Sequence, residues 1–248
     1  MNRPAVLAAA GIAAFLLFLV ALLPATVALR FLPTGLALDG LHGSIWRGSV
    51  DNASWKGHAL GPVRWSSRPW RLPLLELNYA VVYGPPDASV GLDVAVRTGG
   101  RVLLSDLKGS LPISNLHGFL APRGWNGRVE FDVARLELRD GRPVAAEGTV
   151  HVRGLSAPYA GSGGLGDFEL LLGEGSVGSE GIAGRLRDLG TGALTVRATL
   201  TLDPRGQYLL SGEVATAPGA DPRVQQALAY LGPPDSLGRR SFAIEGTL

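Results

Sequence analysis

The chain has 248 residues, of which 46% are hydrophobic and 18% are charged, and its formal net charge is only +2. That length allows one large domain or two small ones with a real core, the apolar content argues against disorder, and the small charge argues against a nucleic-acid-binding protein. The sequence has no cysteine, which excludes disulfides, thiolate metal sites and a cysteine nucleophile. Its 35 glycines, set among short apolar runs, favour a β-rich fold with many turns.

The N-terminal segment 5–29 is uncharged and lies between Arg3 and Arg30. About 20 apolar residues span a bilayer core, so the segment is long enough to be a membrane helix. We expect an uncleaved transmembrane anchor, with residues 1–4 in the cytoplasm and the bulk of the chain in the periplasm of a bacterium. The alternatives are a cleaved signal peptide, with 26–28 as a poor cleavage site, and a buried core helix.

The remaining chain divides into a short linker at 30–40 and a periplasmic β-rich domain at 41–248. Two halves of this domain are expected to meet near the glycine-rich loop 160–166. The stretch 41–49, LHGSIWRGS, is expected to be the first strand after the linker.

Alternation of apolar and polar residues predicts antiparallel strand pairs along the domain. A hairpin is expected where 195–202 turns through DPRG into 208–214. A one-residue shift of the apolar phase near Ala134 predicts a β-bulge. Further strand pairs are expected at 74–83 with 89–96 and at 128–138 with 143–152.

Two short helices are expected. Residues 221–231 begin with aspartate and proline, which are favoured at the cap and first turn of a helix, and 114–120 would form one weak turn. Neither is long enough to connect parallel strands, so the predicted fold is mostly β: a transmembrane helix followed by an elongated, coiled, mainly antiparallel sheet. The apolar face of the longer helix would comprise Val224, Leu228 and Leu231.

A degenerate pentapeptide recurs in which glycine lies between two apolar positions that share its face of a strand. Glycine weakens a strand unless a bulge, a sharp bend or a neighbouring aromatic ring uses the missing side chain. We therefore expect structural glycines facing the core, although such pentapeptides also arise by chance in a glycine-rich chain. The five glycines are Gly43, Gly109, Gly148, Gly212 and Gly246.

Motifs for hydrolytic, phosphate-binding or zinc chemistry are missing from the sequence. The four histidines are far apart, and the acidic residues of 128–138 alternate with apolar ones, as on the solvent face of a strand. We therefore expect no catalytic, cofactor-binding or metal-binding residues and no enzymatic activity. The segment 64–71, RWSSRPWR, suits a membrane interface, or inward-packed tryptophans with arginines that extend to solvent.

Several stretches together resemble the type II secretion system protein N family. They are the N-terminal apolar segment, LDGLHGSIWRGS at 38–49, GPVRWSSRPWRLPLLEL at 61–77, and the hairpin, short helix and terminal glycine strand within 202–248. The resemblance implies an inner-membrane protein with a periplasmic domain that assists the export of folded proteins through an outer-membrane secretin. Its implied partners are the membrane and other secretion components, with no nucleic acid and no cofactor.

The glycine pattern also resembles that of AsmA-like envelope proteins, whose coiled sheet is thought to handle lipid. That resemblance implies an apolar groove and lipid as a partner. A periplasmic enzyme would instead need a polar cleft with clustered titratable groups, of which the sequence gives no sign.

Overall fold

A computed structural model describes most of the chain. The described residues are 15, 18–19, 21–27, 35–55, 58–68, 76–85, 88–97, 99–116, 124–158, 160, 164–173 and 181–247. They form thirteen described strands: β1 (Leu36–Gly43), β2 (Arg47–Trp55), β3 (His58–Ser67), β4 (Leu77–Tyr83), β5 (Val90–Arg97), β6 (Arg101–Pro112), β7 (Asn126–Arg139), β8 (Arg142–Ser156), β9 (Gly166–Leu172), β10 (Ile182–Asp188), β11 (Leu194–Leu202), β12 (Gln207–Thr216) and β13 (Arg240–Thr247).

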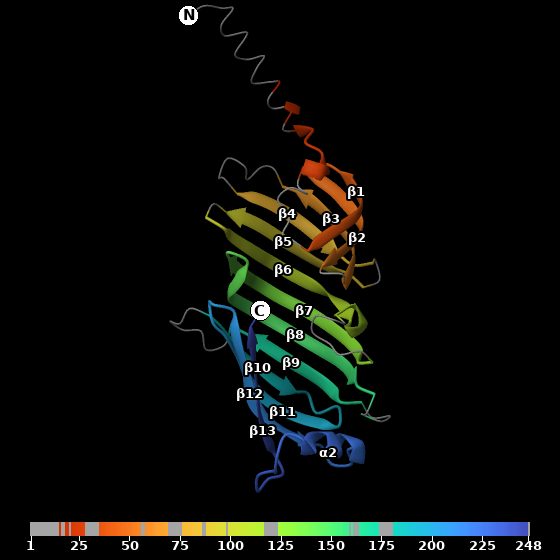
Figure 1. The fold of residues 1–248 in the computed structure, drawn as a ribbon, viewed down its shortest axis with the longest axis vertical. Coiled ribbons are helices and arrows are strands. Elements are labelled where there is room, and N and C mark those ends of the chain that lie inside the picture. The colour runs from red at the N-terminus through yellow and green to blue at the C-terminus, as the bar shows by residue number, and fades with distance from the viewer. Residues whose placement is uncertain are drawn as a thin grey trace, which may run out of the picture.

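These strands make one sheet in which the spatial order is the order along the chain, from β1 to β13. Each strand pairs with the next in antiparallel fashion, as short connections between neighbours require. Figure 1 shows the strands succeeding one another along the long axis, with the strand direction turning steadily as β-sheet twist demands. The prediction of an elongated, mainly antiparallel sheet is confirmed.

The predicted hairpins are present. Strands β11 and β12 pair from Leu202 opposite Tyr208 to Leu194 opposite Thr216. Strands β4 with β5, and β7 with β8, are likewise antiparallel neighbours. The β7–β8 register shifts between Val133 and Arg135, so the bulge predicted at Ala134 is confirmed.

The prediction of a first strand over 41–49 is wrong. Strand β1 begins at Leu36, inside the predicted linker 30–40, and the stretch 41–49 spans the end of β1, a turn at 44–46 and the start of β2. Gly43 adopts a φ of +94°, and the Ser44 hydroxyl accepts hydrogen bonds from the backbone N–H groups of Trp46 and Arg47, both at 3.2 Å. A serine-centred turn of this kind lacks the Asn-Gly or Asp-Gly signal of a tight hairpin. The residue pattern therefore predicted one continuous strand where the chain turns.

The C-terminal helix is confirmed as α2 (Pro222–Ala229), with the Asp221 carboxylate accepting from the Arg223 N–H at 2.8 Å. Val224 is its buried anchor, whereas Leu231 lies beyond the helix end and is 43% exposed, contrary to the predicted apolar face. The shorter prediction corresponds to the 3-10 helix η3 (Ile113–Leu116), and residues 117–120 lie outside the described part of the chain.

The main hydrophobic cluster joins α2 to the C-terminal half of the sheet. Helix α2 lies at the end of the sheet farthest from β1 (Figure 1). Burial of these side chains fixes the helix on the sheet. The cluster comprises Ala157, Ala160, Leu165, Phe168, Val196, Val214 and Val224.

The predicted anchor 5–29 lies largely outside the described residues, which in this segment are 15, 18–19 and 21–27. Within the described part of the chain, no helix has the length and apolar character needed to cross a membrane. Pro24 forms an isolated antiparallel bridge with Ser44, and the Ile45 N–H donates to the Leu23 carbonyl at 3.1 Å. Residues 23 and 24 of this segment therefore contact the β1–β2 turn.

Candidate functional site

One face of the sheet is apolar. Directly opposed residues of antiparallel strands share a face, and the strand registers connect one apolar or glycine residue from each strand into a row across the whole sheet. We call this face the apolar face and this set the central apolar row. The row is Leu41, Val50, Val63, Tyr83, Val90, Gly109, Phe131, Val150, Leu170, Leu186, Ala198, Gly212 and Phe242.

Burial varies strongly over the apolar face. Val50 and Leu111 are almost completely buried, at 2% and 3% exposure. Leu77 and Val96 are 38% and 39% exposed, and Ile244 on the terminal strand is 51% exposed. A hollow of about 750 Å³ lies at the ends of β10–β13 and is lined by residues of both faces, among them Tyr208 and Glu245. The apolar face therefore leaves hydrocarbon side chains accessible near strand ends and at the β13 edge.

The opposite face is charged, and we call it the charged face. A second row crosses it from β6 to β13, parallel to the central apolar row. Its members are polar or charged, which is the alternation expected of a sheet with one wet face. They are Ser110, Glu130, His151, Glu169, Arg187, Arg197, Glu213 and Ser241.

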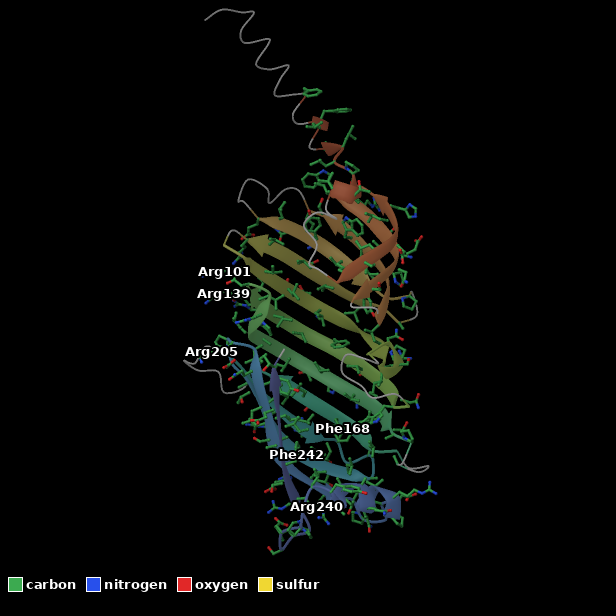
Figure 2. All side chains as sticks on the ribbon, in the orientation of Figure 1. Arg101, Arg139, Phe168, Arg205, Arg240 and Phe242 are labelled. Carbon is green, nitrogen blue, oxygen red and sulfur yellow. The ribbon has the colours of Figure 1, made fainter. Side chains whose placement is uncertain are left out.

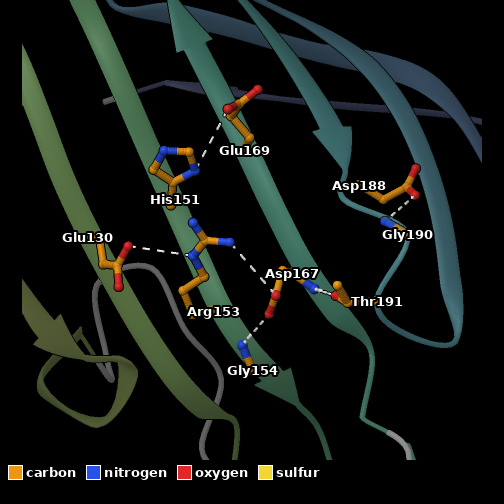
Figure 3. Close-up of polar contacts among 9 residues, drawn as sticks. All are labelled: Glu130, His151, Arg153, Gly154, Asp167, Glu169, Asp188, Gly190 and Thr191. Carbon is orange, nitrogen blue, oxygen red and sulfur yellow. Dashed lines mark hydrogen bonds and ion pairs between the residues drawn. The ribbon is translucent and has the colours of Figure 1, made fainter.

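The middle of the charged row is a network of ion pairs (Figure 3). Glu169 is only 9% exposed and pairs with the Arg187 guanidinium, while His151 Nδ1 lies 3.8 Å from its Oε1 atom. Arg153 lies between Glu130 and Asp167, at 3.5 Å and 3.8 Å. A buried carboxylate needs such partners, because an unpaired charge is costly to desolvate.

The edges of this network join side chains to the backbone. Asp167 accepts from the Gly154 N–H at 2.7 Å, and its own N–H donates to the Thr191 hydroxyl at 2.8 Å. The carboxylate of Asp188 accepts from the Gly190 and Val196 N–H groups. These contacts tie β8, β9 and the β10–β11 turn together (Figure 3), so the network stabilises strand register.

The acidic residues expected on the solvent face of 128–138 lie on the charged face. Each faces a cation: Glu130 faces Arg153, Asp132 faces Lys108 at 3.8 Å, and Glu137 faces Arg135 at 2.8 Å. The described residues include no group of three or more His, Cys, Asp or Glu side chains that could hold a metal ion. His117 lies outside the described residues.

The five predicted glycines lie at close approaches between neighbouring parts of the sheet. A Cβ on Gly43, Gly109, Gly148 or Gly212 would overlap backbone atoms of the adjacent strand. A Cβ on Gly246 would lie 2.6–2.8 Å from the Oη, Cζ and Cε1 atoms of Tyr208. Their steric role remains a prediction that substitution tests.

A further glycine–aromatic pair was not found from the sequence. Gly48 lies opposite Trp65, whose ring occupies the space of a Gly48 Cβ. The Trp65 Nε1–H donates to the Ser44 carbonyl at 3.2 Å, which fixes the ring across the β1–β2 turn. Gly48 is not part of the repeated pentapeptide, so that pattern did not indicate the contact. The only sequence signal for it is a glycine and a tryptophan in neighbouring strands.

Comparison with known proteins identifies the family of the chain. A family model described as "Type II secretion system (T2SS), protein N" matches residues 34–243. A protein of Aeromonas hydrophila named "Type II secretion system protein N" is 27% identical over 266 aligned positions, which cover 100% of each chain. No solved structure gives a significant match. Because the family model covers β1 to β12 and the first half of β13, the chain belongs to the type II secretion system protein N family.

Proposed function

We propose that this chain is a non-catalytic accessory component of a bacterial type II secretion system, assisting the export of folded periplasmic proteins across the outer membrane. The observation that carries the proposal is the family match over 34–243, which includes nearly the entire sheet. The charged side chains of the central network are engaged in ion pairs that fasten strands, an arrangement suited to a structural role.

We place the protein in the inner membrane as a single-pass protein, with segment 5–29 as its anchor and the sheet in the periplasm. The uncharged composition of the segment supports this placement. Protease treatment of spheroplasts tests it: the sheet domain should be digested from outside, and protection of the domain would contradict the proposed orientation.

The free edges of the sheet are the proposed contacts with other secretion components. Strands β1 and β13 each pair with a single described neighbour, so each presents one row of unpaired backbone groups. An extended segment of a partner can add to such an edge through main-chain hydrogen bonds. Strand β13 also exposes Ile244, which would give the added strand an apolar contact.

Deletion of the gene tests the proposed function. Cells lacking it should export less of the enzymes that the system secretes and should retain them in the periplasm. Plasmid-borne wild type should restore export, and leakage of a resident periplasmic enzyme should stay unchanged. Normal secretion in the deletion strain would contradict a secretion role.

A second candidate is an AsmA-like envelope protein whose apolar face handles lipid. The accessible side chains of Leu77, Val96 and Ile244 on that face favour it. Mass spectrometry of protein purified in mild detergent should then find phospholipid at near-stoichiometric ratio, and Leu77→Asp with Val96→Asp should reduce it. Lipid retention unaffected by these changes would contradict the lipid candidate.

A further inference from the structure

We infer that a row of unpaired arginines on the charged face binds an acidic segment of a partner protein. The arginine row is Arg101, Arg139 and Arg142, contributed by β6, β7 and β8. The row would be one contact surface of the proposed secretion component. Only the identity of the partner, another secretion protein, rests on the proposed function. Figure 2 labels Arg101 and Arg139 at the same margin of the sheet.

Strand register brings the arginines together. Arg101 is directly opposite Arg139, and Arg139 is directly opposite Arg142 across the β7–β8 turn. Arg97 of β5 is opposite Arg101 on its other side, so four guanidinium groups follow one another across four strands. The sequence signal is a pair of tight turns flanked by arginine, RTGGR at 97–101 and RDGR at 139–142.

Two of the three nearby carboxylates are already engaged in ion pairs. Glu76 pairs with Arg97 at 2.9 Å, and Glu137 pairs with Arg135 at 2.8 Å. The third, Asp140, lies in the β7–β8 turn with its carboxylate beside Gly100, next to the row, and has no ion pair among the described residues. All three arginines of the row are exposed, and among the residues that the structure describes none of them has an ion-pair partner.

Directly opposed like charges destabilise an antiparallel sheet, and carboxylates supplied from outside would relieve that repulsion. Guanidinium groups hold carboxylates through paired N–H donors. Adjacent strands are about 4.8 Å apart, close to the roughly 5–6 Å between residues at i and i+4 on a helix. A helix with glutamates along one face therefore matches the spacing of the row.

The position of the row favours a protein over a lipid headgroup. Residues 23 and 24 contact the β1–β2 turn, where the proposed anchor meets the sheet. The nearest strand of the row, β6, is five strand positions from β1, which at about 4.8 Å each is roughly 24 Å. A membrane holding the anchor would lie at the other end of that span.

Fluorescence anisotropy on the full chain in detergent micelles tests the inference. The probe is a labelled alanine-rich helical peptide with glutamate at i and i+4 along one face. Replacing Arg101, Arg139 and Arg142 by glutamine should weaken its binding about tenfold or more, which corresponds to about 1.4 kcal/mol. The matched control replaces the exposed Arg197, Arg205 and Arg223 by glutamine, with the same charge change, and should alter the Kd less than about twofold.

Equal weakening by both triple variants would overturn the inference, because it would show attraction to overall charge. The inference would also be overturned, in favour of a membrane, if the protein did not bind the peptide but bound vesicles containing phosphatidylglycerol, and if that vesicle binding required the arginine row. Folding is checked by thermal unfolding, since removal of opposed like charges should leave the midpoint unchanged or higher.

Secretion assays separate this inference from the proposed function. If the row variant binds no peptide yet supports full export, the assembly role stands and this surface is not needed for it. If the row binds the peptide specifically but deletion of the gene leaves export normal, the surface stands and the secretion role fails.

Discussion

Gly212 gives the sharpest test of how the sheet is built. A Cβ at this position would lie 2.5 Å from both the Cα and the Cβ of Ala198 and closer still to the Arg197 carbonyl oxygen. These are mainly backbone atoms of the paired strand β11, so they can move only by separating β11 from β12. Overpacking of this kind costs typically about 1–3 kcal/mol.

Gly91 is a matched control within the same sheet. It also lies in a strand without a positive φ, but the nearest atom to its added Cβ is the Lys108 carbonyl oxygen at 4.0 Å. Alanine is favoured over glycine in a strand where space allows, by roughly 0.5–1 kcal/mol. Gly212→Ala and Gly91→Ala should therefore change stability in opposite directions.

Thermal unfolding of the full chain, followed by circular dichroism, measures both variants. For a domain of this size 1 kcal/mol shifts the Tm by about 2–4 °C. A loss of about 2 kcal/mol for Gly212→Ala thus predicts a fall of about 4–8 °C. Gly91→Ala should leave the Tm equal or slightly higher. A Gly212→Ala protein as stable as wild type would refute the steric explanation.

Three further predictions concern side chains. Arg187→Met leaves the Glu169 carboxylate, on a residue that is 9% exposed, without its guanidinium partner. It should lower the free energy of unfolding in urea by about 1–2 kcal/mol, less than for a fully buried pair because the Arg187 side chain is 54% exposed. Arg197→Met is the control, and equal losses in the two variants would contradict the buried-pair argument. Asp221→Ala removes the α2 cap and should cost about 1 kcal/mol, whereas no loss would show that α2 is held by Val224 alone. The backbone N–H of Arg239 lowers the pKa of the Asp235 carboxyl from its ordinary 3.8, aided by the Leu237 N–H and the Arg239 side chain. A carboxyl whose pKa is lowered in the folded state stabilises the protein above pH 3.8, and this stabilisation is lost as the pH falls through the folded-state pKa. The difference in the free energy of unfolding between wild type and Asp235→Asn should therefore shrink below about pH 4. A constant difference from about pH 2 to 7 would contradict this.

Local patterns predicted the antiparallel pairs well because alternation and turn chemistry act within a few residues. The 195–214 hairpin and the bulge at Ala134 depend only on the phase of neighbouring side chains, and both are present. The Asp-Pro start of α2 is equally local. The β1–β2 turn was missed because a serine hydroxyl, Ser44, replaces the usual Asn-Gly signal.

Features that depend on the register between strands could not be predicted from the sequence alone. Arg101 and Arg139 are 38 positions apart in the chain, and only the β6–β7 register places them opposite each other. The buried Glu169 is similar, because its exposure depends on Arg187 and His151 from the two adjacent strands. A single bulge shifts such a register by one residue and changes every cross-strand partner beyond it.

The central claim is that this sheet works by contacting other components of the secretion apparatus. A photo-crosslinking amino acid placed at Ile244, on the exposed edge strand β13, measures this directly in secreting cells. Tyr230, 89% exposed beyond the end of α2, is the control position for general accessibility. We expect a crosslink from position 244 to another secretion protein, and no such crosslink from position 230. Crosslinks from 244 to phospholipid alone, or to the same proteins as from 230, would contradict it.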